Sequence, residues 1–332
     1  MRKIKKILAS IPGVRKSYNT LVILSYFFYD AKRFLANSAY KRNKTKSSLL
    51  ATIIITYHII EKGLTMPGMY LGFGRKKLLE LIYLCNEFVK NYGKEEQQLN
   101  VAVSVIAEYK KVHEDFSFKL DEKLLSEINA LLDLFEIEPS CQIEMTRERY
   151  YSDLNASFEV FSASRHSVRN FSGAISKEQI IKAVELANNA PSACNRQFIR
   201  VHCISDRELI KSCLSFQNGN RGFGHLADKL LIITADISSV TQHERNDAYT
   251  NAGIYVMNLS YALHKNKVAH CMLNWSVSPS TDLKLRNFLN STNIKISSAE
   301  SIALFIACGD VPECFKLTVS KRKSVNETLA IY

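Results

Sequence analysis

The chain has 332 residues, and 46% of them are hydrophobic, a proportion typical of folded globular proteins that excludes wholesale disorder. The formal net charge of +12 is concentrated at one end, because residues 1–50 hold twelve Lys or Arg and one acidic residue, Asp30, whereas the rest holds 32 basic and 31 acidic residues. The eight cysteines form no C-x-x-C pair and no zinc-ligand spacing, so they predict a reducing, cytoplasmic compartment and no metal site.

The basic N-terminal arm comprises residues 1–46. Its longest apolar stretch, 21–29, is far shorter than the ~20 residues that cross a bilayer, and Pro12-Gly13 interrupts the preceding apolar segment. The arm therefore predicts an amphipathic helix on an anionic membrane surface, which would make the protein peripheral to the membrane. The alternative is a helix that packs on the body of the protein and keeps a solvated basic face. No recognition motif accompanies the charge, so nucleic acid is not an expected partner.

Apolar spacing predicts three helices in the first half of the chain, over 49–62, 76–92 and 97–112. Glycine and proline are frequent between the first two, over 63–74, which predicts a turn-rich break. His58, Glu61 and Lys62 share one helix face before this break. They are interpreted either as part of a lid or substrate-selecting insert over a pocket, or as a solvated ion pair beside an interhelical turn.

Helices and strands mix in the second half. Ser176 and Gln179 have capping-box spacing, which predicts a helix to about Asn189, and 248–264 is a long apolar helix. Branched apolar runs predict strands over 198–205, 229–235, 268–273 and 301–309. The expected fold class is α+β, with a central sheet flanked by helices. A polar stretch over 138–153 divides the chain into a mostly helical region, 1–150, and a second domain, 151–332.

The segment 164–171 is rich in side chains that could bind an anion. Arg165, His166 and Arg169 are three potential cations close in sequence, and Ser167 adds a hydroxyl. The guanidinium fork suits phosphate or the edge of a planar heterocycle, although a solvated basic turn is the alternative. A Pro-Ser turn follows at 190–197, and Lys321-Arg322-Lys323 forms a second cationic cluster near the end of the chain.

The order Arg-His-Ser-x-Arg-x-Phe, Ala-Pro-Ser-x-x-Asn-x-Gln and a late Arg-Lys before a hydrophobic tail resembles the nitroreductase family over about residues 155–332. The resemblance implies a nitroreductase-like sheet, bound FMN and an intertwined homodimer with the flavin at the subunit interface. It also implies NAD(P)H as a transient hydride donor, since the G-x-G-x-x-G fingerprint of a dinucleotide-binding domain is absent.

The resemblance also implies which residues contact the cofactor. Arg165, His166 and Ser167 match positions that hold the phosphate and the ribityl chain, and Arg169 matches the basic residue beside the pyrimidine edge. Arg322 and Lys323 match the late phosphate-binding pair, and Asn220 matches an asparagine at the pyrimidine ring. The loop that reaches the flavin from the other subunit is matched by Pro191, Ser192 and Asn195. The segment whose backbone N–H groups lie near flavin N5 is matched by Met272, Leu273, Asn274 and Trp275. Trp275 is interpreted either as stacking over the flavin or substrate or as core packing.

The expected function is that of an FMN-dependent oxidoreductase, with NAD(P)H-driven two-step reduction of a small organic substrate. No catalytic side chain is named, because the cofactor supplies the chemistry. Phe198-Ile199 replaces a Pro-Trp pair common in the family, and Asn274-Trp275 stands where acidic or glycine residues are common in the nitro-reducing enzymes. These departures keep two alternatives open: a flavin-dependent dehydrogenase or tailoring oxidase, and a membrane-surface flavin-binding protein without turnover.

Overall fold

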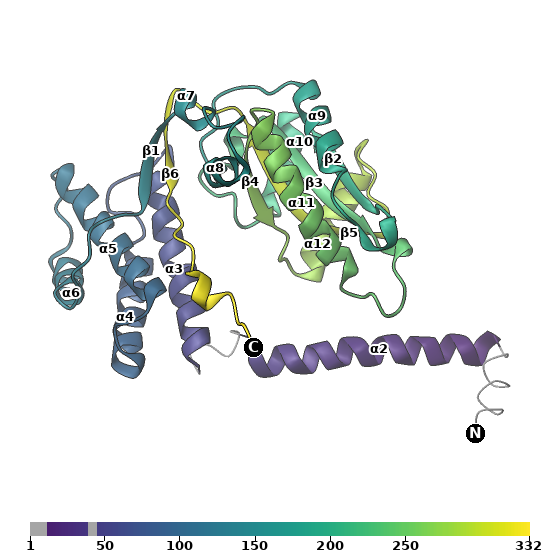
Figure 1. Cartoon of the computed structure of the whole chain (residues 1–332), viewed down its shortest axis with the longest axis horizontal. Coiled ribbons are helices and arrows are strands. Elements are labelled where there is room, and N and C mark those ends of the chain that lie inside the picture. The colour runs from purple at the N-terminus through teal and green to yellow at the C-terminus, as the bar shows by residue number, and fades with distance from the viewer. Residues whose placement is uncertain (1–11, 39–44) are drawn as a thin grey trace.

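The computed structural model describes residues 12–38 and 45–332; the beginning of the basic arm and residues 39–44 lie outside this description. Helix α2 (Pro12–Asn37) confirms the helix that was predicted for the arm. It is a long, straight helix that extends alongside the rest of the chain (Figure 1). No helix within the described residues is both long and apolar enough to cross a membrane.

The first half is helical, as predicted. The three expected helices are α3 (Lys46–Thr65), α4 (Arg75–Tyr92) and α5 (Gln97–Asp115), and a shorter helix, α6 (Glu122–Leu132), follows them. Thr45 begins α3 with a capping box completed by Ser48. The apolar faces of these helices form one hydrophobic core that spans residues 49–141, in which Phe88 and Tyr109 are among the largest fully buried side chains.

The turn-rich break between α3 and α4 folds back onto this helical core. Gly72 and Gly74 adopt positive φ angles of 80° and 68°, which favour glycine. The Gly72 N–H donates to His113 Nε2 at 2.8 Å, and the Tyr109 hydroxyl donates to the Phe73 carbonyl at 2.8 Å. The tip of the break is therefore part of the helical region.

A two-stranded antiparallel ribbon links this region to the C-terminal end of the chain. It pairs β1 (Gln142–Thr146) with β6 (Cys314–Thr318). Two short helices, α7 (Arg147–Tyr150) and α8 (Phe158–Ser164), lead from the ribbon into the second half. Neither strand of the ribbon was among the predicted elements.

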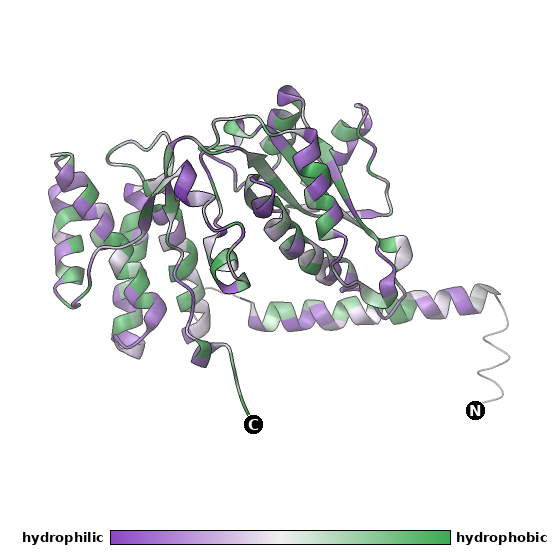
Figure 2. Cartoon of the chain, turned by 45° about the horizontal axis from the view of Figure 1, so that its top comes forward, coloured by the Kyte–Doolittle hydropathy of each residue, from purple (hydrophilic) through white to green (hydrophobic). Residues whose placement is uncertain are grey.

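The second half contains a four-stranded antiparallel sheet in the order β2-β3-β5-β4. Its strands confirm the four that were predicted: β2 (Ile199–Ile204), β3 (Lys229–Asp236), β4 (Ala269–Asn274) and β5 (Glu300–Gly309). The sheet is predominantly hydrophobic (Figure 2), because helices cover both of its faces. The α+β class is thus confirmed.

Alternation along the strands assigns each side chain to one of the two cores. Leu231 and Ile233 pack with α9 (Lys177–Ala187) and α11 (Asp247–Lys265). Leu230 and Ile232 face the other core, with side chains of α10 (Arg207–Ser215) and α12 (Pro279–Asn290). Among the residues that the structure describes, four short 3-10 turns complete the fold: η2 (Ala193–Asn195), η3 (Gly224–Leu226), η4 (Ile237–Ser239) and η5 (Val325–Glu327).

Candidate functional site

The arginine-rich segment leaves α8 and runs along the open edge of the sheet. The Val168 N–H donates to the His270 carbonyl on β4 at 3.0 Å, which fixes the segment beside that strand. Within the described residues, Arg165 Nε is buried and has no hydrogen-bond partner. Burial, with the charge of Arg165 as a smaller cause, lowers the pKa of His270 to about 4. A guanidinium with a buried, unused donor is well suited to an anionic ligand.

His166 is influenced by charges from both the first and the last cationic motif. Its Nδ1 lies 2.9 Å from the Ser164 carbonyl oxygen. Burial lowers the pKa of the His166 ring, and the positive charges of Arg165 and Arg322 lower it further. Arg322, which is 156 positions beyond His166 in the sequence, is therefore close to it in space.

Arg169 lies where β4, β6 and α3 approach one another. Its Nη1 donates to the Thr318 hydroxyl at 3.3 Å. Burial raises the pKa of the Cys271 thiol on β4, and the neighbouring charges of Arg169 and Lys62 oppose that rise. Arg169 is thus near a buried thiol and near a lysine of the helical region.

The outer edge of β4 presents a backbone donor between these groups. The carbonyls of His270 and Asn274 point to this edge, since they accept from Val168 N–H and from Gln217 Nε2, the latter at 3.0 Å. Backbone groups of alternate residues point to the same side of an antiparallel strand, so the Met272 N–H points there too. The backbone groups of Leu273 point to the opposite side, toward β5, and its side chain is buried in the core.

Two of the predicted contact residues have structural partners of their own. The Trp275 indole stacks on Phe305 with ring centroids 4.7 Å apart, and its Nε1 donates to Asp282 at 2.8 Å, an arrangement typical of core packing. Asn220 Nδ2 donates to the Leu214 and Gln217 carbonyls at 2.8 and 2.6 Å, so it closes the end of α10.

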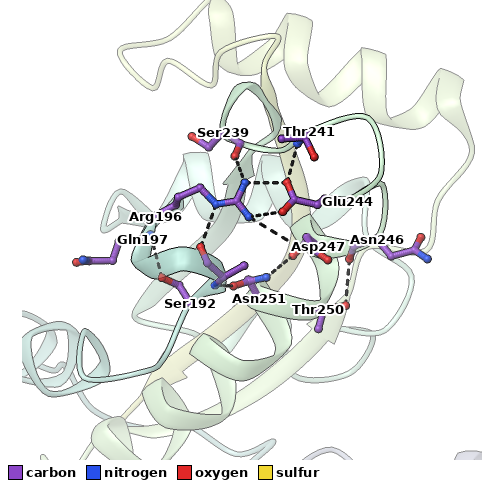
Figure 3. Close-up of polar contacts among 11 residues, drawn as sticks. Ser192, Arg196, Gln197, Ser239, Thr241, Glu244, Asn246, Asp247, Thr250 and Asn251 are labelled. Atoms are coloured by element: carbon purple, nitrogen blue, oxygen red, sulfur yellow. Dashed lines mark hydrogen bonds and ion pairs between the residues drawn. The ribbon is translucent and has the colours of Figure 1, made fainter. Parts of the chain in front are cut away.

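The loop with Pro191, Ser192 and Asn195 is held elsewhere (Figure 3). Arg196 forms a fork with both carboxylate oxygens of Glu244 at 2.8 Å each, and the Ala193 N–H donates to Asn251 on α11 at 2.8 Å. In the described part of the chain, no hydrogen bond joins this loop to the segment 164–169. The loop borders a separate hollow of about 230 Å³ beside α11. A single chain therefore leaves the two motifs apart.

The helix face with His58, Glu61 and Lys62 packs against the end of the chain. Glu61 is 1% exposed, its Oε1 accepts from the Ser320 N–H at 2.8 Å, and its Oε2 lies 3.0 Å from His58 Nδ1. The interpretation of these residues as a solvated ion pair is therefore wrong, because the acid is buried and holds a backbone N–H of the distant segment.

Helix α5 holds the same segment further along. The buried Gln98 amide donates to the Lys321 carbonyl at 3.4 Å and accepts from the Tyr57 hydroxyl at 2.7 Å, and Gln97 accepts from the Ser324 N–H at 3.0 Å. A cleft of about 300 Å³ opens between these helices and residues 320–323. The contacts of Gln97 and Gln98 were not predicted from the sequence. Their position at the start of an apolar helix was the one feature that could have indicated a polar role.

Comparison with known proteins agrees with the sequence motifs. The model of the Nitroreductase family matches residues 163–219, the segment that carries the arginine-rich motif and the Ala-Pro-Ser loop. The resemblance to the nitroreductase family is thereby shown over this segment. Nothing matches among curated proteins.

Similar solved structures include a nitroreductase family protein from Streptococcus pneumoniae, with 17% identity, coverage of 53% of this chain and 100% of that chain, and a TM-score of 0.45. They also include an FMN-dependent nitroreductase from Clostridium difficile, with 21% identity, coverage of 46% and 87%, and a TM-score of 0.39.

Proposed function

We propose that the chain is an FMN-dependent oxidoreductase of the nitroreductase type, with residues 151–332 as its flavin-binding domain. The observation that carries the proposal is Arg165 beside the open edge of β4, whose Nε is buried without a partner in the described residues, with the charge of Arg322 near enough to lower the pKa of the neighbouring His166. An excess of cations beside a free sheet edge fits a phosphate attached to a planar ring.

Several of the predicted contact residues would take part in binding FMN. Arg165, His166, Ser167 and Arg322 would hold the phosphate and ribityl end, with Lys323 beside them. Arg169 would place its charge at the pyrimidine edge, where it favours an electron-rich ring. The Met272 N–H on the edge of β4 would donate to flavin N5. FMN, when bound, supplies the hydride chemistry, while these residues bind it, orient it and set its electronics.

A homodimer is part of this proposal. Pro191, Ser192 and Asn195 match a family loop that reaches the flavin of the other subunit. Their position beside α11, with hydrogen bonds to Asn251 and Glu244 and not to the arginine-rich segment, supports a role toward a second copy. Such a dimer would complete each site with residues from both chains.

The first test is the visible absorption spectrum of the purified protein. Flavin bands near ~450 nm are expected in the wild-type protein, because the cofactor supplies the chemistry. Arg165→Gln with Arg322→Gln should retain no FMN, whereas the exposed Arg207→Gln on α10 should match the wild type. Full FMN occupancy in the double variant, or no flavin in the wild type after reconstitution, would refute the proposal.

Anaerobic addition of NADH or NADPH separates the reductase from the alternatives. Bleaching of the flavin bands is expected if a nicotinamide reduces the protein and a second substrate then takes the electrons. Bands that persist with both nicotinamides would favour a substrate-oxidising enzyme with O2 as acceptor, or a flavin-binding protein without turnover.

We also propose that the arm places this enzyme on an anionic membrane surface at the cytoplasmic face. One side of α2 is fixed to the body by Tyr26 and Asp30, which contact His243 at 3.0 Å and Arg245 at 2.9 Å. The other side is apolar and unpaired within the described residues. Its exposed side chains include Leu21, Leu24, Phe28 and Leu35.

The spacing and the charge of α2 favour a lipid partner. Leu21, Leu24, Phe28 and Leu35 recur at helical intervals and form one apolar stripe. Arg15 and Lys16 near one end of the helix and Lys32 and Arg33 near the other leave Asp30 as its single acid. Apolar burial combined with attraction to acidic headgroups is the usual basis of interfacial helix binding.

Sedimentation with phosphatidylserine vesicles tests the arm. The full chain should pellet with these vesicles and not with phosphatidylcholine vesicles, and pelleting should decrease as salt screens the charges. Leu24→Glu with Phe28→Glu should abolish pelleting. Ser25→Glu with Ala36→Glu adds the same charge off the stripe and should retain most of it. Equal pelleting of the full chain and a chain without residues 1–46 would contradict the proposal.

A further inference from the structure

The C-terminal end of α3 packs against the second half of the chain. Met66, which follows α3, packs with the core cluster of the second half that also includes Trp275. Its Sδ lies 3.5 Å from where a Cβ on Gly222 would be, so the helix end contacts the loop that carries Asn220. The helical region thus reaches the edge of the sheet.

A chain of hydrogen bonds connects this end of α3 to Arg169. Glu61 accepts from the Ser320 N–H at 2.8 Å, and the Ser320 hydroxyl donates to Thr318 Oγ1 at 3.0 Å. Thr318 Oγ1 in turn accepts from Arg169 at 3.3 Å. The backbone of α3 next to Glu61 is therefore held in a fixed position relative to the Arg169 guanidinium.

Lys62 comes directly after Glu61 and is half-buried. Burial lowers the pKa of the Lys62 ammonium, and the charge of Arg169 lowers it further, while Cys271 raises it. Both oxygens of the adjacent Glu61 are occupied by Ser320 and His58. Among residues 12–38 and 45–332, no ion pair neutralises Lys62 or Arg169, so two cations lie close together without a counter-ion.

Two neighbouring cations that share no acid repel one another, and a negatively charged or electron-rich group between them relieves that repulsion. Arg169 is the residue that the proposed function assigns to the pyrimidine edge of FMN. We propose that Lys62, supplied by the helical region, is a second cation at that edge, where with Arg169 it stabilises the reduced flavin. This inference rests on the proposed function. It makes the helical region a contributor to the site itself.

The midpoint potential of the bound flavin tests this role. Lys62→Gln should still bind oxidised FMN, but its reduced form should bind about tenfold more weakly, because reduction adds charge that Lys62 no longer stabilises. A tenfold change corresponds to a potential lower by about 30 mV for a two-electron couple. Lys62→Arg keeps the charge and should restore most of the potential. Lys76→Gln removes an exposed lysine of α4 and should leave the potential unchanged.

The outcomes separate this inference from the proposed function. A wild-type protein that binds no FMN would overturn both. A wild-type protein that binds FMN, together with a Lys62→Gln variant of unchanged potential, would overturn the role of Lys62 alone. Loss of all FMN from Lys62→Gln would also overturn this role, because the charge of Lys62 is assigned to the reduced flavin and not to retention of the oxidised one.

Discussion

Arg196 shows how one side chain can fix a loop. Its guanidinium binds both oxygens of Glu244 and donates to the Ser239 carbonyl at 2.6 Å (Figure 3). It also lies over the Phe198 ring, 5.6 Å from the ring centroid. These contacts tie the loop after α9 to the segment before α11. Planar, bidentate geometry of this kind is specific to arginine.

The same ion pair predicts a pH dependence. The hydrogen bonds from Arg196, and then from the Thr241 N–H, lower the pKa of Glu244 from 4.5 to about 2. A lowered carboxyl pKa stabilises the folded protein above pH 4.5, and this contribution is lost as the pH falls toward 2. Glu244→Gln should therefore lower the Tm at pH 7, and the difference from the wild type should shrink between about pH 4.5 and pH 2.

Thermal melts followed by circular dichroism across this pH range would measure the difference. The exposed Glu185→Gln on α9 serves as the control, because its carboxylate has no partner among the described residues. A difference for Glu244→Gln that stays constant down to pH 2 would contradict the assignment of the stabilisation to this carboxylate.

At the level of single residues, the sequence could indicate the site only where the site residues are close to one another in the chain. Arg165, His166 and Arg169 occur within one short segment, so their pattern was readable without a fold. The contact between Glu61 and Ser320 joins residues 259 positions apart, and no local spacing encodes it. For Trp275 two interpretations were open, and the stacking on Phe305 favours core packing.

Among the elements, the strands of the main sheet were predictable because branched apolar residues run through β3 and β5, which are buried on both faces. Strands β1 and β6 were not predicted. Each has five residues, and β1 is nowhere fully buried, so it lacks a clear alternation. Such a ribbon is determined by which chain segments meet, and composition alone does not show that.

Helix α3 and the turn after it depend on one close approach. A Cβ on Gly63 would lie 2.1 Å from Phe73 Cε2, and the Phe73 ring packs against Tyr109 at 5.3 Å between centroids. Gly63→Ala should therefore displace this ring and destabilise the protein by about 1–3 kcal/mol, as overpacking does elsewhere. Urea unfolding would measure the loss.

Gly68→Ala in the same turn is the matched control, because a Cβ there has nothing within 4 Å. We expect this variant to unfold at the wild-type urea concentration. If Gly63→Ala also did so, the packing of Phe73 would be looser than the contact implies.

At the scale of the whole molecule, the hydrophobic cores support a division of the chain near residue 150. One core spans residues 49–141, and the cores of the second half begin at Tyr150. The polar stretch over 138–153 made such a division predictable from composition, and the boundary at 150/151 stays a prediction. The return of the chain end to α3 and α5 was not predictable, since it depends on three polar contacts made by Glu61, Gln97 and Gln98.

This return determines the order in which the molecule can be completed as it is synthesised. Gln142 at the start of β1 pairs with Thr318 at the end of β6, so almost the whole second half must be translated between the two strands. At ~5–20 residues per second, β1 emerges on the order of ten seconds before its partner. The helices can assemble early, but Glu61 stays without the Ser320 N–H until the last segment arrives. The candidate site is therefore one of the last parts of the protein to form.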